Sequence, residues 1–228
     1  MTNSTPPAEP SAPGGPPEAP PGVGASDFER WQARYSRTSA AGPPHDGGAP
    51  SPLLAAELGA LPGGGRRALD LACGAGRHSV WLAGRGWRVT GVDFAPAGLA
   101  RARDAAASLP TAARPRFVVG DLERWRPDDG GWDLVVLAYF HLPELLRRVP
   151  PWLAPGGRLL VLTHAPESPA GPANPRYRPT LAGLRASLDA SGIALEYLRA
   201  DTAGDPDVDL VTVVHARRPA PGAAEGAR

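Results

Sequence analysis

Three acidic residues carry the clearest chemistry in the sequence, because each follows or ends a short apolar segment. Asp70 precedes the Gly74–Gly76 turn, Asp93 ends the next apolar segment, and Asp121 follows the third. A carboxylate can accept a charge-assisted hydrogen bond from an ammonium group, or accept both hydroxyl protons of a ribose. Glycines between a strand and a helix let a ligand approach free backbone N–H groups. The pattern predicts a niche for a nucleotide-like ligand.

The glycine turn requires a strand before it and a helix after it. Residues 68–72 are an apolar run bounded by breakers, and a helix is expected from near Gly76 to Gly84. A second helix is expected over 51–61, with Ser51 as its N-cap. The other expected strands are 87–92, 116–119, 132–138, 193–199 and 208–215, together with a tight turn into a strand over 153–162. The other expected helices are 27–35, 95–108, 143–153 and 180–190.

The glycine turn departs from the dinucleotide-binding fingerprint. The third glycine of G-x-G-x-x-G is replaced by Ser79, and Asp70 stands where a nicotinamide-binding turn is usually apolar. The run D-x-x-x-G-x-G instead resembles motif I of the class I S-adenosylmethionine-dependent methyltransferases. In that family the acidic residue helps hold the amino-acid part of the cofactor, and the glycines lie under its methionine and ribose. The resemblance therefore implies S-adenosylmethionine as the cofactor.

A second stretch is similar to the same family. The Pro155–Gly157 turn followed by an apolar strand is typical of these methyltransferases, where it joins a helix to a strand. The resemblance covers residues 27–215, and implies a Rossmann-like α/β sheet of seven strands, mostly parallel, with an antiparallel C-terminal hairpin and helices on both faces. Residues 1–26 and 216–228 are expected to be disordered tails, because they hold few large apolar side chains.

The resemblance places the cofactor at the ends of the first four strands. Asp93 is expected to bind the ribose, with a helix N-cap as the alternative, because the spacing from Asp70 suits a nucleotide-binding fold. Asp121 is expected to bind the adenine amino group and Leu122 to pack on the ring, with a simple turn as the alternative. The expected cofactor-binding residues are Asp70, Ala72, Cys73, Gly74, Gly76, Asp93, Phe94, Asp121, Leu122 and Ala138.

Two residues after the fourth strand are the candidate catalytic groups. Tyr139 and His141 would face the reacting methyl group, because ligands of open α/β sheets bind beyond the carboxyl ends of the strands. Either could accept or orient the proton of an oxygen or nitrogen acceptor, whereas a soft sulfur, selenium or tellurium anion would need no base. The alternatives are a rim aromatic for Tyr139 and a hydrogen-bonded loop histidine for His141.

The candidate acceptor-binding residues come from two distant segments. Trp31 and Tyr35 share the aromatic face of the expected helix 27–35, which either covers the cofactor as a lid or packs on a core edge. Arg176 and Tyr177 end a Pro-rich loop that resembles the acceptor-site insertion of the tellurite-resistance-type branch of the family. Arg176 would attract an anionic acceptor, and its alternative is a solvated loop charge.

Composition excludes several other classes of protein. The net charge is +1 and no basic face is evident, so a nucleic acid is not an expected partner. The family resemblance implies a small-molecule acceptor. The 24 basic residues are all arginines, which excludes phosphate-loop and Schiff-base lysines. The sequence has a single cysteine, and it shows no secretory signal and no apolar run long enough to cross a membrane, so a cytoplasmic protein is expected. We expect a monomer or a weak homodimer. The histidines are scattered, so no metal site is expected.

The resemblance therefore implies methyl transfer by in-line displacement. Such a reaction needs alignment and exclusion of water, and no obligatory acid or base. Two alternatives remain open at this point, an NAD(P)-binding oxidoreductase and a non-catalytic domain that binds S-adenosylmethionine.

Overall fold

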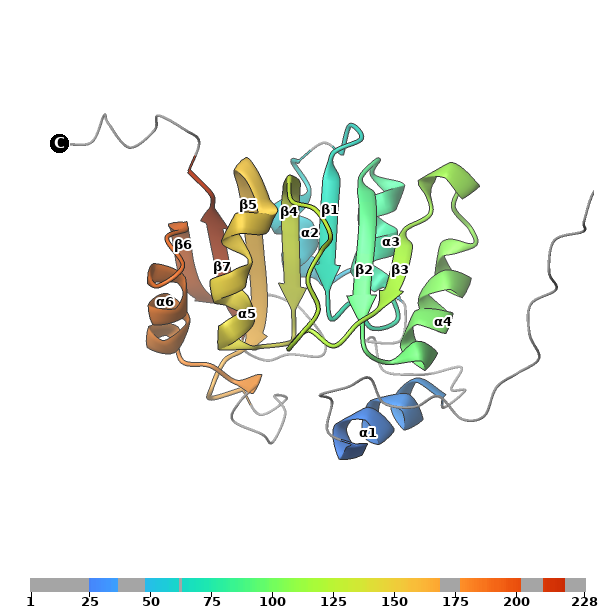
Figure 1. The fold of residues 1–228 in the computed structure, drawn as a ribbon, viewed down its shortest axis with the longest axis horizontal. Coiled ribbons are helices and arrows are strands. Elements are labelled where there is room, and N and C mark those ends of the chain that lie inside the picture. Colours follow the sequence, from blue (N-terminus) through green and yellow to red (C-terminus); the bar gives the residue numbers. More distant parts are fainter. Residues whose placement is uncertain (1–24, 37–47, 62, 169–176, 202–210, 220–228) are drawn as a thin grey trace, which may run out of the picture.

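The computed structural model describes residues 25–36, 48–61, 63–168, 177–201 and 211–219. In this part of the chain seven strands form one sheet in the order β3-β2-β1-β4-β5-β7-β6 (Figure 1). The strands are β1 (Arg67–Leu71), β2 (Arg88–Asp93), β3 (Arg116–Val119), β4 (Trp132–Ala138), β5 (Leu153–His164), β6 (Ala194–Asp201) and β7 (Val211–Arg217).

The first five strands are parallel, and β7 runs antiparallel to both β5 and β6. The expected mostly parallel sheet with an antiparallel C-terminal hairpin is thus confirmed. The strand order reverses between β1 and β4, and open α/β sheets bind their ligands beside such a reversal.

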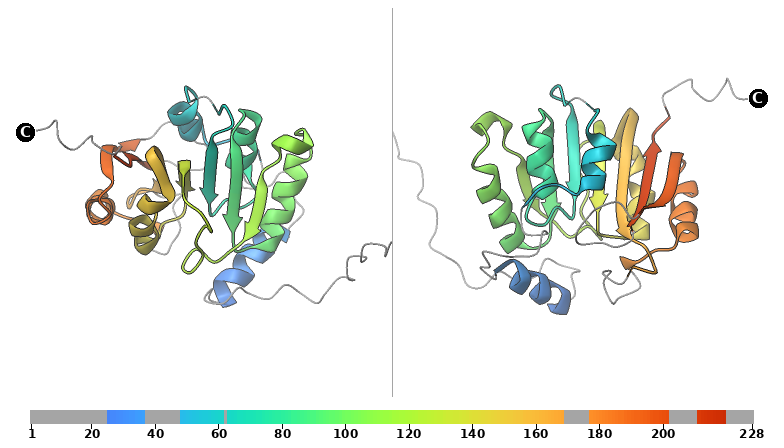
Figure 2. Two further views of the ribbon diagram at one scale, coloured as in Figure 1. Left: turned by 45° about the horizontal axis from the view of Figure 1, so that its top comes forward. Right: turned by 180° about the vertical axis from the view of Figure 1, so that it is seen from behind.

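Helices cover both faces of this sheet (Figure 2). Helices α5 and α6 lie on one face, whereas α2, α3 and α4 lie on the other, and α1 crosses the edge at which the parallel strands end (Figure 1). The helices are α1 (Ala25–Ser36), α2 (Pro52–Leu58), α3 (Arg77–Gly84), α4 (Pro96–Ala106), α5 (Pro143–Arg148) and α6 (Leu181–Asp189), with short 3-10 turns η2 (Thr111–Ala113) and η3 (Pro150–Trp152). None of the described helices combines the length and the apolar character that crossing a membrane would take.

The core lies on both faces of the central strands. Four consecutive side chains of β4, Leu134 to Leu137, are fully buried, and they alternate between two hydrophobic clusters. Burial on both faces explains why this strand reads as an uninterrupted apolar run in the sequence. The ends of β1 and β4, after which the glycine loop and Tyr139 follow, are therefore held by strands with fully buried side chains.

Several element boundaries differ from those expected. The helix expected over 143–153 ends at Arg148, because Pro150 and Pro151 lack the N–H groups that an α-helix needs, and the chain continues as η3. The Pro155–Gly157 turn lies inside β5, which begins at Leu153. Helix α1 begins at Ala25 and β7 continues to Arg217, so both elements extend by two residues beyond the expected 27–215 segment.

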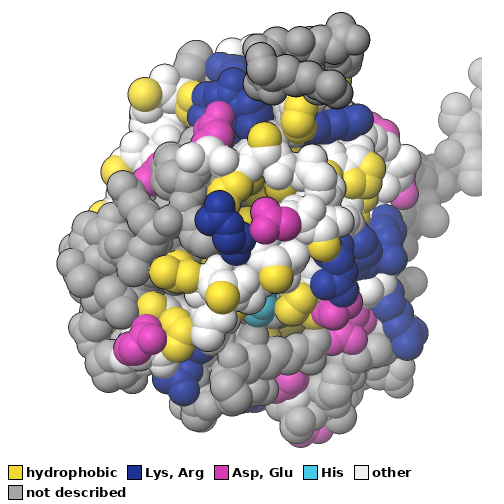
Figure 3. Space-filling model, turned by 90° about the vertical axis from the view of Figure 1, so that its left-hand side faces the viewer, with side chains coloured by type: hydrophobic (Ala, Val, Ile, Leu, Met, Phe, Trp, Pro, Cys, Tyr) yellow, Lys and Arg dark blue, Asp and Glu magenta, His cyan; other side chains and the backbone are white. Residues whose placement is uncertain are grey.

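The end of the sheet formed by β6 and α6 carries mixed charges. Figure 3 shows basic and acidic side chains close together on this face, separated by small apolar patches. Glu196 on β6 forms ion pairs with Arg158 on β5 at 3.6 Å and with Arg217 on β7 at 2.7 Å. These ion pairs are partly exposed, so each contributes little to the free energy of unfolding. Positive and negative charges are therefore mixed on this face.

Candidate cofactor and acceptor site

The loop after β1 has a left-handed backbone at alternate positions. The φ angles of Ala72, Gly74 and Gly76 are 55°, 53° and 80°. Glycine adopts this conformation freely, whereas Ala72 pays about 1–2 kcal/mol for it. The Gly76 N–H donates to the Cys73 carbonyl at 2.9 Å, which closes the turn directly before α3 begins at Arg77. The loop therefore presents bare main chain at the carboxyl end of β1.

Asp93 connects this loop to the end of β2. The Gly74 N–H donates to Asp93 Oδ2 and the Ala95 N–H donates to Asp93 Oδ1, both at 2.9 Å. Burial raises the pKa of Asp93, and the hydrogen bonds from Ala95 and Gly74 oppose this effect. Ala95, not Asp93, occupies the N-cap position of α4. Each carboxylate oxygen can accept a further hydrogen bond, so the side chain can hold the loop and bind a hydroxyl group together.

Asp70 and Ser79, the two residues that depart from the dinucleotide fingerprint, are hydrogen-bonded to each other. The Ser79 hydroxyl donates to Asp70 Oδ2 at 2.6 Å, and both side chains are buried. The pKa of Asp70 is raised to about 7, mainly by burial; the hydrogen bond from Ser79 opposes this shift and the nearby charge of Asp93 adds to it. The pair joins β1 to α3 beneath the glycine loop. A cation bound above two buried carboxylates would be stabilised by their charge.

Asp121 has one oxygen in use and one available. Its Oδ1 accepts the Glu123 N–H at 2.9 Å, whereas Oδ2 is buried and accepts no hydrogen bond from the described residues. A buried acceptor without a donor costs about 1–3 kcal/mol, which a ligand N–H group would recover. Leu122 is buried in the core cluster beside this carboxylate. The orphaned oxygen and the apolar neighbour fit the amino group and ring of an adenine.

Helix α1 lies directly against the glycine loop. A Cβ atom placed on Gly74 would collide with the hydroxyl of Tyr35, so this phenol covers the loop. Trp31 stacks on the Tyr35 ring at a centroid distance of 5.7 Å. Gln32 accepts the Ala97 N–H at 2.9 Å through its side-chain oxygen, which fixes α1 at the start of α4. Both Trp31 and Tyr35 are thus brought beside the expected cofactor residues, as is Phe94, whose ring lies 6.3 Å from that of Phe28.

A second polar group forms where α2, α3, β4 and β5 meet, and we call it the Arg77–Tyr139 cluster. It consists of Ser51, Arg77, His78, Tyr139 and His164, of which four are buried and Tyr139 is partly exposed. The Tyr139 hydroxyl is 2.9 Å from Ser51 Oγ, and its ring lies 5.3 Å from the Arg77 guanidinium and 5.4 Å from the His164 ring. Tyr139 has a φ of 59°, a left-handed conformation that the surrounding contacts must stabilise.

Ser51 does not cap α2 as expected. It occupies the N-cap position, but its side chain makes no cap hydrogen bond and pairs with Tyr139 instead. Its N–H donates to His78 Nε2 at 3.2 Å, which requires that nitrogen to be unprotonated. The hydroxyl that was expected to stabilise a helix end therefore orients a candidate catalytic side chain.

Three of the remaining candidate residues, Ala138, His141 and Tyr177, lie at or after the ends of β4 and β5. His141 is buried, and Ala138 is the last residue of β4. The Tyr177 ring lies 5.9 Å from that of Phe140, next to the two candidate catalytic residues in the sequence. Arg176 lies outside the described residues. Burial raises the pKa of the Cys73 thiol well above its usual value, so this side chain packs as a small apolar group.

Sequence reasoning missed several residues of the site. Arg77 could be identified from the sequence, because it is a cation directly after the glycine turn. The sequence pattern marks Ser79 only as the replacement of a glycine. Gln32, His78 and His164 had no signal, because their contacts join segments far apart in the chain. In the described residues no group of histidine, cysteine, aspartate and glutamate side chains could hold a metal ion.

Residues 68–157 match the model of a known family, described as a methyltransferase domain. This segment runs from β1 to the turn inside β5 and contains the glycine loop, Asp93 and Asp121. This segment of the chain is therefore similar to a methyltransferase domain. Of the residues of the site, those on α1 and the three residues Ser51, His164 and Tyr177 lie outside it.

Curated relatives share this segment with the chain. The trans-aconitate 2-methyltransferase of Streptomyces avermitilis is 38% identical over 46% of this chain and 42% of that protein. A probable thiol methyltransferase of Arabidopsis thaliana is 32% identical over 52% of this chain and 55% of that protein. The ribosomal RNA small subunit methyltransferase C of Alcanivorax borkumensis is 33% identical over 43% of this chain and 32% of that protein. The chain thus spans about a third to a half of the length of these relatives.

A solved structure shows that the fold extends beyond the matched segment. The magnesium protoporphyrin IX methyltransferase of Synechocystis PCC 6803, solved with S-adenosylmethionine bound, superimposes with a TM-score of 0.59 at 20% identity. The similarity covers 85% of this chain and 92% of that one. The described sheet and helices therefore form a Rossmann-like methyltransferase fold.

Proposed function

We propose that the protein is an S-adenosylmethionine-dependent methyltransferase that transfers a methyl group to a small-molecule acceptor. The observation that carries this proposal is the arrangement of three features at the ends of neighbouring strands. These are the bare main chain at Gly74, the carboxylate of Asp93 and the orphaned oxygen of Asp121. Together they suit the methionine, ribose and adenine parts of one extended ligand, in the order in which β1, β2 and β3 lie side by side.

Each part of the cofactor has an assigned partner. Asp93 binds the ribose hydroxyls, because its oxygens keep acceptor capacity beyond the two backbone hydrogen bonds. Asp121 Oδ2 accepts from the adenine amino group, and Leu122 packs on the ring. Asp70 acts from beneath the loop, where its charge favours the ammonium and sulfonium groups even though Ser79 occupies one of its oxygens.

The residues of this chain align the reactants and handle the proton. When bound, the cofactor supplies a methyl group on a sulfonium, which an acceptor attacks in line while the carbon–sulfur bond breaks. Tyr35 and Trp31 cover the glycine loop and so exclude water from it. Tyr139, held by Ser51, orients an acceptor at the end of β4, and His141 takes the proton from an oxygen or nitrogen acceptor.

We further propose an anionic small molecule as the acceptor class. The buried guanidinium of Arg77 beside Tyr139 favours an anion, and the Pro-rich loop that ends at Tyr177 resembles that of the tellurite-resistance-type branch. The trans-aconitate enzyme, by its name, acts on a small polycarboxylate. The ribosomal RNA enzyme shares only about a third of its length with this chain, so its acceptor is not transferred here.

The proposal is tested by comparing cofactors and then measuring turnover. Calorimetric titrations with S-adenosylmethionine, S-adenosylhomocysteine and NAD should show saturable binding of the first two and weaker binding of NAD. Radiolabelled S-adenosylmethionine should then transfer its methyl group to a member of a panel of small carboxylates, thiols and chalcogen anions. Tighter binding of NAD would reject the cofactor assignment. Cofactor binding without turnover on any acceptor would favour a non-catalytic binding domain.

A further inference from the structure

A cavity of about 260 Å³ lies at the amino-terminal ends of strands β1, β2 and β3. The candidate cofactor site lies at the carboxyl ends of the same strands. Four arginines line the cavity, Arg67, Arg88, Arg114 and Arg116, which we call the amino-edge arginines. They stand where β1, β2 and β3 begin, whereas Asp93 stands where β2 ends. At about 3.3 Å per residue, the length of β2 separates the two sites by roughly 16 Å.

The register of the sheet gathers three of these arginines on one face. Arg67 is the in-register partner of Arg88, and Thr90 is the partner of Arg116. Partners in a parallel sheet point to the same face, and so do residues two apart on one strand, such as Arg88 and Thr90. Three guanidiniums from three neighbouring strands are thus placed side by side, a repulsive arrangement unless anions compensate it.

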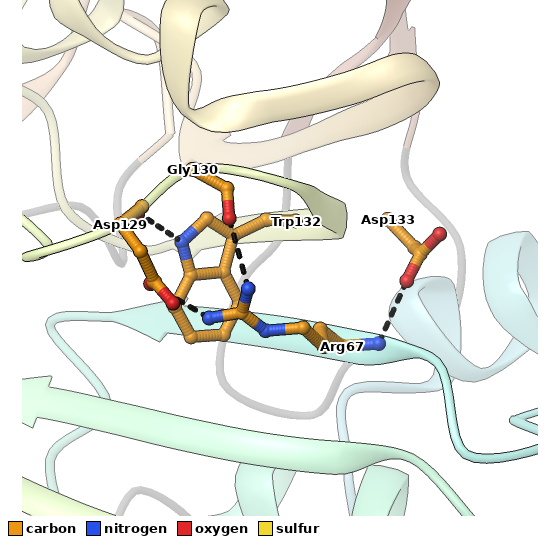
Figure 4. A network of polar contacts seen from close by, with 5 residues as sticks. All are labelled: Arg67, Asp129, Gly130, Trp132 and Asp133. Carbon is orange, nitrogen blue, oxygen red and sulfur yellow. Dashed lines mark hydrogen bonds and ion pairs between the residues drawn. The ribbon is translucent and has the colours of Figure 1, made fainter.

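Arg67 lines the cavity, and the positive charge of its guanidinium is already balanced by an ion pair. Figure 4 shows its polar contacts. Its guanidinium donates to Asp129 Oδ1 at 2.7 Å and to the Gly130 carbonyl at 2.8 Å, and lies 4.1 Å from the centre of the Trp132 ring. Its backbone N–H donates to Asp133 Oδ2 at 2.8 Å. These contacts give Arg67 a direct anionic partner in Asp129.

The other three amino-edge arginines form no ion pair in the described residues, although, after the hydrogen bond from Arg67, the charge of Arg116 also helps to lower the pKa of Asp129. Arg88 donates through Nε to the Gly65 carbonyl at 2.7 Å, and Arg114 donates to the carbonyls of Leu109 and Ala107 at 3.1 and 3.0 Å. These backbone hydrogen bonds hold both guanidiniums and leave other N–H groups of each for a ligand. Arg116 is exposed at the start of β3, and none of the three forms an ion pair within the described part of the chain. No carboxylate is among the residues that line the cavity.

We propose that the amino-edge arginines bind a small polyanion that carries two or more phosphate or carboxylate groups. Two or more anionic groups are needed to match three guanidiniums that form no ion pair, each of which can hold such a group by paired hydrogen bonds. A small ligand fits better than a nucleic acid strand, because the tryptophans of the cavity, Trp87 and Trp132, are buried and offer no open ring for base stacking. The site is independent of the proposed methyl transfer at the other edge.

The experiment is a calorimetric titration of the full chain with pyrophosphate, and separately with citrate, at low ionic strength. The wild type should bind at least one of the two saturably. R116Q should weaken that binding several-fold, and R88Q/R116Q should weaken it by about tenfold or more, as expected for lost charge-assisted hydrogen bonds. R185Q is the matched control, because Arg185 is an exposed arginine on α6 outside the cavity, and it should bind like the wild type.

Two results would overturn this inference. One is that neither anion binds the wild type saturably, or that R88Q/R116Q binds them as tightly as R185Q does. The other is that a single-stranded oligonucleotide binds in an Arg88- and Arg116-dependent manner while neither small anion competes with it. Thermal melting and binding of S-adenosylhomocysteine, measured on each variant, show whether the fold is kept. R116Q alone removes only an exposed side chain, so it keeps the test valid if the double variant is unstable.

Discussion

At the scale of single residues, the candidate site consists of carboxylates whose oxygens are only partly used. Asp93 accepts two backbone N–H groups and Asp121 accepts one, so both are oriented before a ligand arrives. Orientation of this kind reduces the ordering cost of binding. We therefore expect both residues to contribute to cofactor affinity.

The D93A variant should lose about 2–3 kcal/mol of affinity for S-adenosylmethionine, because it removes charge-assisted hydrogen bonds to the ribose. Isothermal titration calorimetry measures this loss directly. D129A, which removes an exposed carboxylate at the far edge of the sheet, should bind the cofactor like the wild type. Unchanged affinity in a folded D93A protein would refute the ribose assignment.

The buried Asp70 predicts a particular dependence of stability on pH. Its pKa is raised from 3.8 to about 7, so between these values the folded protein holds a proton that the unfolded chain releases. The contribution of Asp70 to the free energy of unfolding therefore falls as pH rises through this window, by at most about 1.4 kcal/mol per pH unit, and is constant above it.

The D70N variant lacks this titration. Its stability relative to the wild type should rise by about 2 kcal/mol between pH 5 and pH 7, as measured by urea denaturation at each pH. The comparison between the two proteins cancels the titration of other groups. A difference that stays constant over this range would show that Asp70 keeps an ordinary pKa in the folded protein.

At the scale of elements, the packing of α1 on the glycine loop is the contact that sequence reasoning defines least. The aromatic spacing predicts the helix and its apolar face, but it leaves open whether that face covers the cofactor or a core edge. The structure places Tyr35 against Gly74 and Gln32 at the start of α4. Neither contact follows from periodicity, because each depends on how a loop directs the chain between distant segments.

A double-mutant cycle tests this contact. G74A should destabilise the protein, because Gly74 has a positive φ and its new Cβ would meet the Tyr35 hydroxyl. Part of that cost should disappear in the Y35A background, which gives a coupling free energy of about 0.5–3 kcal/mol between the two positions in denaturant titrations. If the two effects simply add, α1 does not lie on the loop in solution.

The sheet elements were much easier to predict than the side chains that meet between them. The strands at 68–72, 116–119 and 132–138 were located from short apolar runs between breakers, and the structure confirms them to within one residue. Ser51 occupies the expected N-cap position, but its side chain pairs with Tyr139 instead of capping the helix, and the sequence does not distinguish these two uses of a serine. The expected roles of Asp70, Asp93 and Asp121 stay predictions, although the fold brings the loop, Asp93 and Asp121 to one edge of the sheet.

At the scale of the whole molecule, the site depends on the rigidity of the central strands. L137A should lower the free energy of unfolding by about 2–5 kcal/mol, because Leu137 is fully buried in β4 and truncation leaves a cavity. L181A should change it by less than about 0.5 kcal/mol, because Leu181 is 41% exposed on α6. Urea denaturation measures both. Equal effects would contradict the assignment of β4 to the centre of the core.

Side chains of opposite charge gather at the two ends of strands β1, β2 and β3. Carboxylates gather at the ends of β1 and β2 and after β3, and arginines gather at the starts of the same three strands. This polarity is hidden in the net charge of +1, because the two groups cancel in the total. A cationic cofactor would be attracted to the carboxyl ends of these strands, and an anionic ligand to their amino-terminal ends.

The central claim is that residues at the carboxyl ends of β1, β2 and β3 bind one adenosyl ligand. A crystal structure with S-adenosylhomocysteine tests this claim most directly. The account predicts ribose hydroxyls within hydrogen-bond distance of Asp93, the adenine amino group on Asp121 Oδ2, and the sulfur above the Gly74–Gly76 loop. A ligand bound at any other edge of the sheet, or an adenine that leaves Asp121 Oδ2 without a donor, would contradict it.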